Sequence, residues 1–352
     1  MKYIYFIGRY TGHGIYNFFP FYKENYRPHE MEGILKSKNI RITNNIKNAD
    51  IIMFRNKPEK TTDTHLKKFK SQIDKNHSNK VIINNYKAFY NFDSKDRSYK
   101  IWRDNSLNAP DFLAFNYEEL KNNKEQIINQ IDRFRKNKTR IFLRTNNETG
   151  SKGMLLIRKN HGINYIQKCV EKLINRLIKI NEDRSDSKLL AVEFLDFEND
   201  KYFNLYRAHV VGDKIICFYA LSSTKDKFHC KDMTMNDMDR FIKANSNFNQ
   251  LLNSNKKIKL EIINSLKLLG CNIGAIEFFI INDEIYFLEL NPIWNGHAGR
   301  QGFGNEKFQQ YLNKNRGRLE SSIPNIYNFL DHAKFYQKLY DEISKIKLIE
   351  KK

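Results

Sequence analysis

The sequence predicts a protein of mixed α/β and α+β class, and three observations carry this prediction. Over residues 1–92, short apolar runs alternate with helical patterns, which is typical of parallel strands joined by helices. Further along, apolar strand patterns come in pairs joined by short polar turns, which is typical of antiparallel hairpins. The third observation is one such hairpin, GAIEFFIINDEIYFLELNPIWNG at Gly274–Gly296, because oxygen-bearing side chains interrupt its apolar strands.

Composition sets the broad class. The chain has 352 residues, of which 40% are hydrophobic and 13% aromatic, so we expect a globular protein of two or three modest domains. No apolar run approaches the roughly 20 residues of a membrane span. The first residues lack the apolar core and cleavage site of a signal peptide, so a cytoplasmic location is expected. The four cysteines are far apart and show no metal-binding spacing.

The net charge of +21 suggests an anionic substrate. A basic surface attracts nucleic acid, anionic polymers and nucleotide phosphates alike. The lysines are spread along the whole chain, and no dense basic block or basic-aromatic platform stands out. This distribution argues against a nucleic-acid role.

The first region reads as a small α/β domain. Its strands are expected at Tyr3–Gly8, Ile51–Phe54 and Val81–Asn84, all apolar enough to be buried on both faces. Helical patterns at Glu30–Ser37 and Asp63–Ile73 separate them.

Two helices come next, and both are amphipathic. The first is expected at Lys95–Asn105 and is stopped before Pro110, where an extended segment begins. The second covers Tyr117–Asn137, with apolar residues at helical spacing.

A glycine-containing hairpin follows. The strands Ile141–Arg144 and Met154–Ile157 flank a loop that holds Gly150, Ser151 and Gly153. Glycines let backbone N–H groups approach anionic oxygens, so this loop is a candidate phosphate-binding element. An ordinary hairpin with a Gly-Ser loop is the alternative interpretation.

The remaining elements alternate in the same way. The expected order is helix, strand, hairpin, helix ended by Gly270, the Gly274–Gly296 hairpin, and a C-terminal helix. The expected bounds are Gly162–Ile180, Leu189–Leu195, Tyr202–Val211 with Lys214–Leu221, Lys257–Leu269 and Ile323–Ile346.

The hairpin at Gly274–Gly296 is expected to pair Ala275–Ile281 with Ile285–Leu290 across a three-residue turn. Such a turn puts Glu277 opposite Glu289, and Asn291 shares their face. Unpaired carboxylates are costly in so apolar a hairpin, and Mg²⁺ prefers such oxygen ligands. A core hairpin whose glutamates pair with Lys or Arg is the alternative, and the spacing does not choose between the two.

Taken in order, these features resemble the ATP-grasp superfamily, which includes D-alanine–D-alanine ligase and glutathione synthetase. The resemblance runs from the N-terminal domain to about Gly304. It implies an ATP-grasp fold with four segments: an N-terminal Rossmann-like (pre-ATP-grasp) domain at 1–92, a small subdomain with the glycine loop at 93–190, a C-terminal subdomain with the metal site at 191–322, and a helical extension at 323–352.

The resemblance also implies roles for particular residues. The metal ligands fall on Glu277, Glu289 and Asn291, where the Glu-x-Asn step and the twelve-residue separation match the family pattern. Arg207 matches an arginine of the site, and Arg144 stands where the family commonly has a phosphate-binding lysine; the resemblance implies a catalytic role for both. The nucleotide-binding positions fall on Lys95, Arg144, Ser151, Lys152, Gly153, Glu193, Phe194 and Leu195, with Asp200 or Glu198 for the ribose.

The implied activity is that of a carboxylate–amine ligase that uses ATP and Mg²⁺. A substrate carboxylate becomes an acyl phosphate, and an amine then captures it as an amide. The positive charge favours an acidic substrate, such as an acidic amino acid, a peptide or a uronic-acid glycan. Two alternatives stay open: an ATP-grasp kinase, and a basic polymer-binding protein with a degenerate nucleotide site. A homodimer is compatible with the resemblance.

Overall fold

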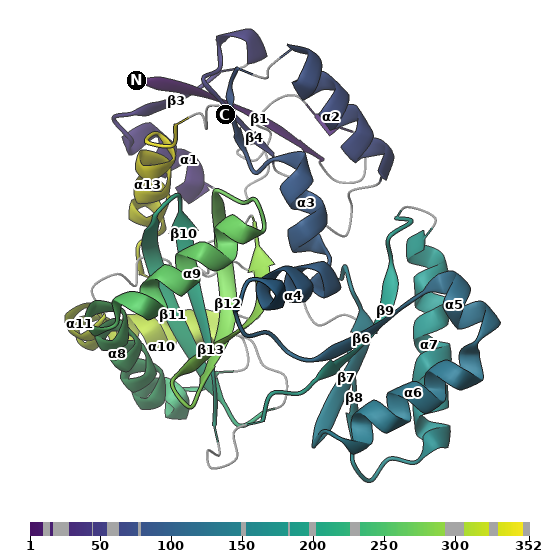
Figure 1. Cartoon of the computed structure of the whole chain (residues 1–352). Coiled ribbons are helices and arrows are strands. Elements are labelled where there is room, and N and C mark those ends of the chain that lie inside the picture. Colours follow the sequence, from purple (N-terminus) through teal and green to yellow (C-terminus); the bar gives the residue numbers. More distant parts are fainter. Residues whose placement is uncertain are drawn as a thin grey trace.

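A computed structural model describes residues 1–9, 15–16, 28–43, 45–54, 63–76, 79–148, 153–181, 184–196, 202–225, 233–292, 306–323 and 330–347. Across these ranges the strands form three sheets, with helices packed on them, so the predicted mixed α/β class is confirmed (Figure 1). No helix in the described ranges is long and apolar enough to cross a bilayer.

The N-terminal sheet is largely parallel, as predicted. Its central strand β1 pairs in parallel with β3 and β4, and β4 with β5, while the short β2 pairs antiparallel with β1. Strand β3 was not predicted, because three residues are too few to show a pattern. The elements are β1 (Lys2–Arg9), β2 (Ile15–Tyr16), α1 (Pro28–Lys36), β3 (Ile40–Ile42), the 3-10 turn η1 (Ile46–Asn48), β4 (Ile51–Phe54), α2 (Asp63–Asn76) and β5 (Val81–Ile83).

The last helix of the chain returns to this first sheet. Helix α13 (His332–Ile343) packs along α1, and its buried Phe335 and Tyr340 share a core with Phe6 and with Ile273 of a second sheet. The continuous helix expected over Ile323–Ile346 is wrong. Ile323 instead caps α11 (Arg316–Ser322), which follows α10 (Glu306–Lys314).

The small sheet has the strand order β6-β9-β7-β8 and lies to the right in Figure 1, with α5, α6 and α7 on its outer face. The single helix expected at Tyr117–Asn137 is wrong: Asn123 ends α5, and α6 starts after it. Strand β9 ends at Glu193, short of the expected Leu195. The elements are β6 (Phe112–Asn116), α5 (Tyr117–Asn122), α6 (Lys124–Lys136), β7 (Arg140–Thr145), β8 (Leu155–Arg158), α7 (Ile163–Asn181) and β9 (Lys188–Glu193).

The large sheet is antiparallel throughout, in the order β11-β10-β12-β13. Helix α9 ends as predicted at Gly270, whose φ of 78° lies in the left-handed region that glycine tolerates. Helix α8 was not predicted. The elements are β10 (Phe203–Val211), β11 (Lys214–Ser223), η4 (Met235–Asp237), α8 (Met238–Ser254), α9 (Lys256–Leu268), β12 (Ile273–Ile281) and β13 (Glu284–Asn291).

The β12–β13 turn corrects one step of the sequence prediction. The turn has two residues, Asn282 and Asp283, with φ of 50° and 64°, and Ile281 pairs directly with Glu284. This is the positive-φ geometry of a tight hairpin turn, and it would shift the pairing by one residue. A bulge beside Glu277 restores the shift, so Glu277 still lies opposite Glu289. The expected pairing is confirmed, although the three-residue turn is wrong.

Helix α4 (Lys95–Asp104) joins the large and small sheets. It follows α3 (Tyr86–Asp93), which was not predicted, and contacts α9 and β13 (Figure 1). Its Trp102 is fully buried: the indole Nε1 donates to the Ser265 carbonyl at 2.8 Å, and the ring lies 5.5 Å from that of Phe287. Trp102 therefore fixes the start of the small-sheet segment to the large sheet.

We expect Trp102→Ala to lower the free energy of unfolding by about 3–5 kcal/mol, because it leaves a cavity and an unpaired carbonyl. Urea denaturation followed by circular dichroism measures this. The matched control is Lys100→Ala on the exposed side of the same helix, expected to change stability by less than about 0.5 kcal/mol. A loss for Trp102→Ala no larger than that of the control would contradict this anchoring role.

Candidate functional site

A row of three charged side chains crosses the large sheet. Arg207 on β10 pairs in register with Glu277 on β12, which pairs in register with Glu289 on β13. Directly opposed residues of neighbouring antiparallel strands project from the same face. Their side chains are 15–20% exposed, so all three are only partly covered.

Glu277 occupies the middle of this row. Its Oε1 forms an ion pair with the Arg207 guanidinium, which lies 5.6 Å from the centroid of the Tyr219 ring. The Asn291 amide Nδ2 lies 3.5 Å from the same Oε1. The structure therefore brings together Glu277, Glu289 and Asn291, as expected of the candidate metal ligands.

Lys95 reaches the row from the first residue of α4. Its side chain is 3% exposed, and Nζ lies 3.5 Å from Glu289 Oε1 and donates to the Glu148 carbonyl at 3.0 Å. Burial lowers the pKa of Lys95, the Glu289 carboxylate opposes that shift, and Arg144 adds to it. Lys95 is thus a buried amine held between one carboxylate and one carbonyl.

Arg144 approaches from the facing sheet. On β7 it alternates with the fully buried Leu143, so it projects from the sheet face opposite the helices. Its guanidinium donates to the Glu148 carbonyl at 3.2 Å, the same oxygen that accepts from Lys95. We call the resulting set the charged centre: Lys95, Arg144, Arg207, Glu277, Glu289 and Asn291.

Buried hydrogen bonds hold Lys95 in place. The Lys95 backbone N–H donates to the Asn146 carbonyl at 3.1 Å, and the Asn146 amide donates to Ser94 Oγ at 2.8 Å. Asp96, the next residue on α4, pairs with Lys188 at 2.7 Å. These contacts tie the start of α4 to the segment after β7 and to β9, and they hold Lys95 in a fixed position.

The residues of the charged centre suit a Mg²⁺ site better than a site built from three or more His, Cys, Asp and Glu side chains. The described part of the chain contains no group of three or more His, Cys, Asp and Glu residues arranged to hold a metal ion. Two carboxylates and one amide match Mg²⁺, which is usually bound through one or two carboxylates together with substrate phosphates. Arg207 pairs with Glu277 and Lys95 pairs with Glu289, which is the alternative that the sequence left open.

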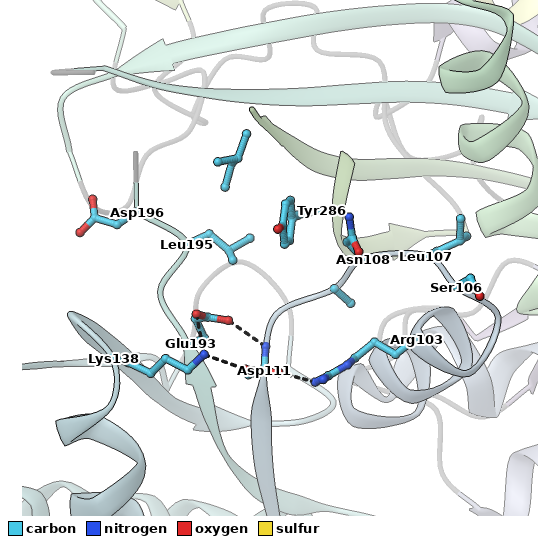
Figure 2. A pocket seen from close by; sticks show the side chains of 12 residues that line it. Arg103, Ser106, Leu107, Asn108, Asp111, Lys138, Glu193, Leu195, Asp196 and Tyr286 are labelled. Atoms are coloured by element: carbon cyan, nitrogen blue, oxygen red, sulfur yellow. Dashed lines mark hydrogen bonds and ion pairs between the residues drawn. The ribbon is translucent and has the colours of Figure 1, made fainter. Parts of the chain in front are cut away.

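A pocket of about 700 Å³ opens between the two sheets (Figure 2). Ile281 and Tyr286 border it from the turn end of the β12–β13 hairpin, and Glu193 and Leu195 border it from the end of β9. Ile281 is four residues from Glu277 on the same strand, so both face the same side of the large sheet. The pocket and the charged centre thus belong to one face.

Ion pairs form one wall of this pocket (Figure 2). Lys138 bridges Glu193 at 2.8 Å and Asp111 at 2.6 Å, and Arg103 pairs with Asp111 at 2.6 Å. The Asp111 backbone N–H donates to Glu193 at 3.1 Å. The carboxylate of Glu193 is therefore held in a fixed position.

The other expected nucleotide residues are placed differently. Phe194 is buried, with the Arg140 guanidinium 3.9 Å from its ring centroid, and it does not border the pocket. Gly153 lies within the described residues and has a φ of 63°. The expected positions Ser151, Lys152, Glu198 and Asp200 lie outside the described residues.

Sequence reasoning missed Glu148, Asn146, Lys138 and Asp111 as parts of this arrangement. Glu148 and Asn146 lie in the segment expected to cover phosphate, but their contacts run through backbone oxygens and buried amides. Any residue type supplies a backbone carbonyl, so the sequence carries no signal for Glu148. In the sequence, nothing distinguishes Lys138 and Asp111 from ordinary surface charges.

No protein-family profile and no curated protein matches the chain. Several solved structures do. The chain is similar to the D-alanine–D-alanine ligase from Bacillus anthracis complexed with ATP, at 12% identity over 98% of this chain and 96% of that chain, with a TM-score of 0.49. For the VanG D-Ala:D-Ser ligase from Enterococcus faecalis the identity is 14%, the shares 86% and 74%, and the TM-score 0.48.

A third similar structure is that of the ATP-grasp ligase PsnB complexed with a minimal precursor, Mg and ADP. The identity is 13%, the shares are 85% of this chain and 79% of that chain, and the TM-score is 0.41. These are likenesses of fold.

The buried Lys95 gives a testable pH dependence. Its folded-state pKa lies below its ordinary value of 10.5, so between the two values the unfolded chain binds more protons. The contribution of Lys95 to the free energy of unfolding therefore rises with pH between its folded-state pKa and 10.5. We expect the stability of the wild type minus that of Lys95→Met to rise in urea denaturation as the pH is raised toward 10.5. Lys100→Met is the exposed control; a flat or falling difference for Lys95→Met would refute the inference.

Proposed function

We propose that this protein is an ATP-dependent ligase that activates a substrate carboxylate as an acyl phosphate and joins it to an amine. The observation that carries the proposal is the charged centre itself. Two carboxylates and an amide on the large sheet face two cations, Lys95 at the start of α4 and Arg144 on the small sheet. A nucleotide triphosphate needs both kinds of group, because its phosphates bind cationic side chains and a divalent ion together.

The residues divide into two roles in this proposal. Lys95 and Arg144 bind phosphate oxygens, and Glu277, Glu289 and Asn291 hold Mg²⁺ beside them. When bound, the ion supplies charge neutralisation on the phosphates. Breaking the Lys95–Glu289 and Arg207–Glu277 pairs costs little overall, because each partner gains an oppositely charged ligand group in exchange.

The reaction needs no nucleophile from the protein. A carboxylate oxygen of the substrate attacks the γ-phosphorus and ADP leaves; the amine then attacks the acyl carbon and inorganic phosphate leaves. Such phosphoryl transfer depends mainly on positioning and charge neutralisation. Arg207, at the opposite end of the row from Lys95, is suited to stabilising the negative oxygens of the acyl phosphate.

The pocket between the sheets is proposed to take the nucleoside end of ATP. It lies on the same face as the charged centre, and its volume of about 700 Å³ accommodates a base and ribose. Glu193 and Leu195 are at its border, in the segment where the family resemblance expects adenine contacts. The net charge of +21 favours an acidic acceptor substrate, such as an acidic amino acid, a peptide or a uronic-acid glycan.

We expect Glu289→Gln and Asn291→Ala to lower kcat/KM for amine-dependent ADP release by roughly a hundredfold or more, because each removes an oxygen ligand or its charge at the reacting phosphates. A coupled ADP assay over a panel of carboxylates and amines measures this. Glu284→Gln is the matched control, an exposed glutamate at the start of the same strand, and is expected to leave the rate unchanged.

Three outcomes of this assay separate the candidate functions. ADP release that requires both a carboxylate and an amine supports the ligase. ADP release without any amine, with a stable phosphorylated product, would instead establish the kinase. Salt-sensitive binding of an anionic polymer that survives Glu289→Gln, without ADP release, would establish the binding protein.

A further inference from the structure

Glu148 connects the two phosphate-binding cations to the helical layer behind them. Its backbone oxygen accepts hydrogen bonds from Lys95 Nζ at 3.0 Å and from the Arg144 guanidinium at 3.2 Å. Its carboxylate is bound on both oxygens by the guanidinium of Arg176, which comes from α7. One residue thus joins the charged centre to a helix that contributes no residue to that centre.

We propose that the Glu148–Arg176 ion pair is a positioning unit that sets the spacing of Lys95 and Arg144 for phosphate binding. This inference rests on the proposed function, because it concerns how the same site binds its nucleotide. Neither Glu148 nor Arg176 was a candidate site residue from sequence.

The pair is built to be rigid. The side chain of Glu148 is only 11% exposed, and Oε2 accepts from Arg176 Nε at 2.5 Å and from Thr145 Oγ1 at 2.6 Å. A two-point guanidinium–carboxylate contact fixes orientation as well as distance. Since the carboxylate is held, the carbonyl of the same residue is held too, and the two cations that bind it keep a constant separation.

The backbone at Gly153, the last glycine of the glycine-containing loop, lies against this ion pair. A Cβ added to Gly153 would lie 2.8 Å from Glu148 Oε2 and 2.9 Å from Arg176 Nε, so backbone without a side chain passes directly over the ion pair. The φ of 63° at Gly153 independently favours glycine. Glu148 and Gly153, which flank residues 149–152, therefore meet at Arg176.

The chemistry of the pair predicts what its loss does. Without Arg176, the nearly buried carboxylate of Glu148 has lost its bound cation and is expected to turn toward Lys95 and Arg144. Both cations would then be neutralised by a protein carboxylate and displaced from their shared carbonyl. This change is expected to weaken nucleotide binding equally in the ground state and in the transition state. KM is therefore expected to change more than kcat.

The experiment measures the Kd of Mg·ADP by isothermal titration calorimetry on the full chain, with KM for ATP and kcat from ADP release. We expect Arg176→Ala to weaken Mg·ADP binding roughly tenfold and to raise KM by a similar factor, with kcat changed much less. Arg176→Lys is expected to restore part of the affinity, since a lysine supplies the charge without the fork.

Two controls separate positioning from general damage. Glu171 lies on the same helix as Arg176 and forms an exposed ion pair with Lys124 of α6. Glu171→Gln breaks that pair and is expected to leave Kd unchanged. In an Arg144→Ala background, Arg176→Ala is expected to cost less than it does alone, because one of the positioned cations is already absent. If Arg176→Ala does not fold, as judged by thermal unfolding, Glu148→Gln replaces it and is expected to weaken Mg·ADP binding in the same direction.

The outcomes distinguish this inference from the function on which it rests. A wild type that binds Mg·ADP together with unchanged Kd in the folded Arg176 variants overturns the positioning role alone. An equal effect of Glu171→Gln, or full additivity with Arg144→Ala, also overturns it. A wild type that does not bind Mg·ADP overturns the proposed function and this inference with it.

Discussion

The arrangement of this protein depends on one buried amine. Lys95 is almost completely buried, and a buried ammonium group is stable only when it has ion-pair or hydrogen-bond partners. Those partners come from different parts of the fold: Glu289 from the hairpin of the large sheet and the Glu148 carbonyl from the segment that follows β7 of the small sheet. The buried charge of Lys95 therefore links the two sheets, and Arg144 shares the Glu148 carbonyl with it.

Ion pairs hold the charged side chains of this centre in place. Glu277 pairs with Arg207 and Glu289 pairs with Lys95, while the Arg144 guanidinium is bound by a backbone carbonyl. The Lys95 N–H donates to the Asn146 carbonyl at the start of α4, and the Trp102 indole donates to the Ser265 carbonyl near its end, so both ends of the helix are held.

Much of this could be predicted from sequence, and the failures have physical causes. Apolar runs and helical spacing located most elements, and the alternation of Glu277, Glu289 and Asn291 with apolar residues located the carboxylate row. The three-residue turn was wrong because positive φ at Asn282 and Asp283, and a compensating bulge, are not visible in a hydrophobic pattern. Glu148 was missed because it acts through a carbonyl that every residue has. The break at Asn123 was missed because the apolar spacing continues across it.

The most direct test of the account is a crystal structure of the full chain with Mg²⁺ and a non-hydrolysable ATP analogue. We expect a cation bound to oxygens of Glu277, Glu289 and Asn291, phosphates in contact with Lys95 and Arg144, and the nucleoside in the pocket beside Glu193 and Tyr286. A nucleotide bound elsewhere, or one bound while Arg207–Glu277 and Lys95–Glu289 keep their pairs and no cation is present, would contradict it.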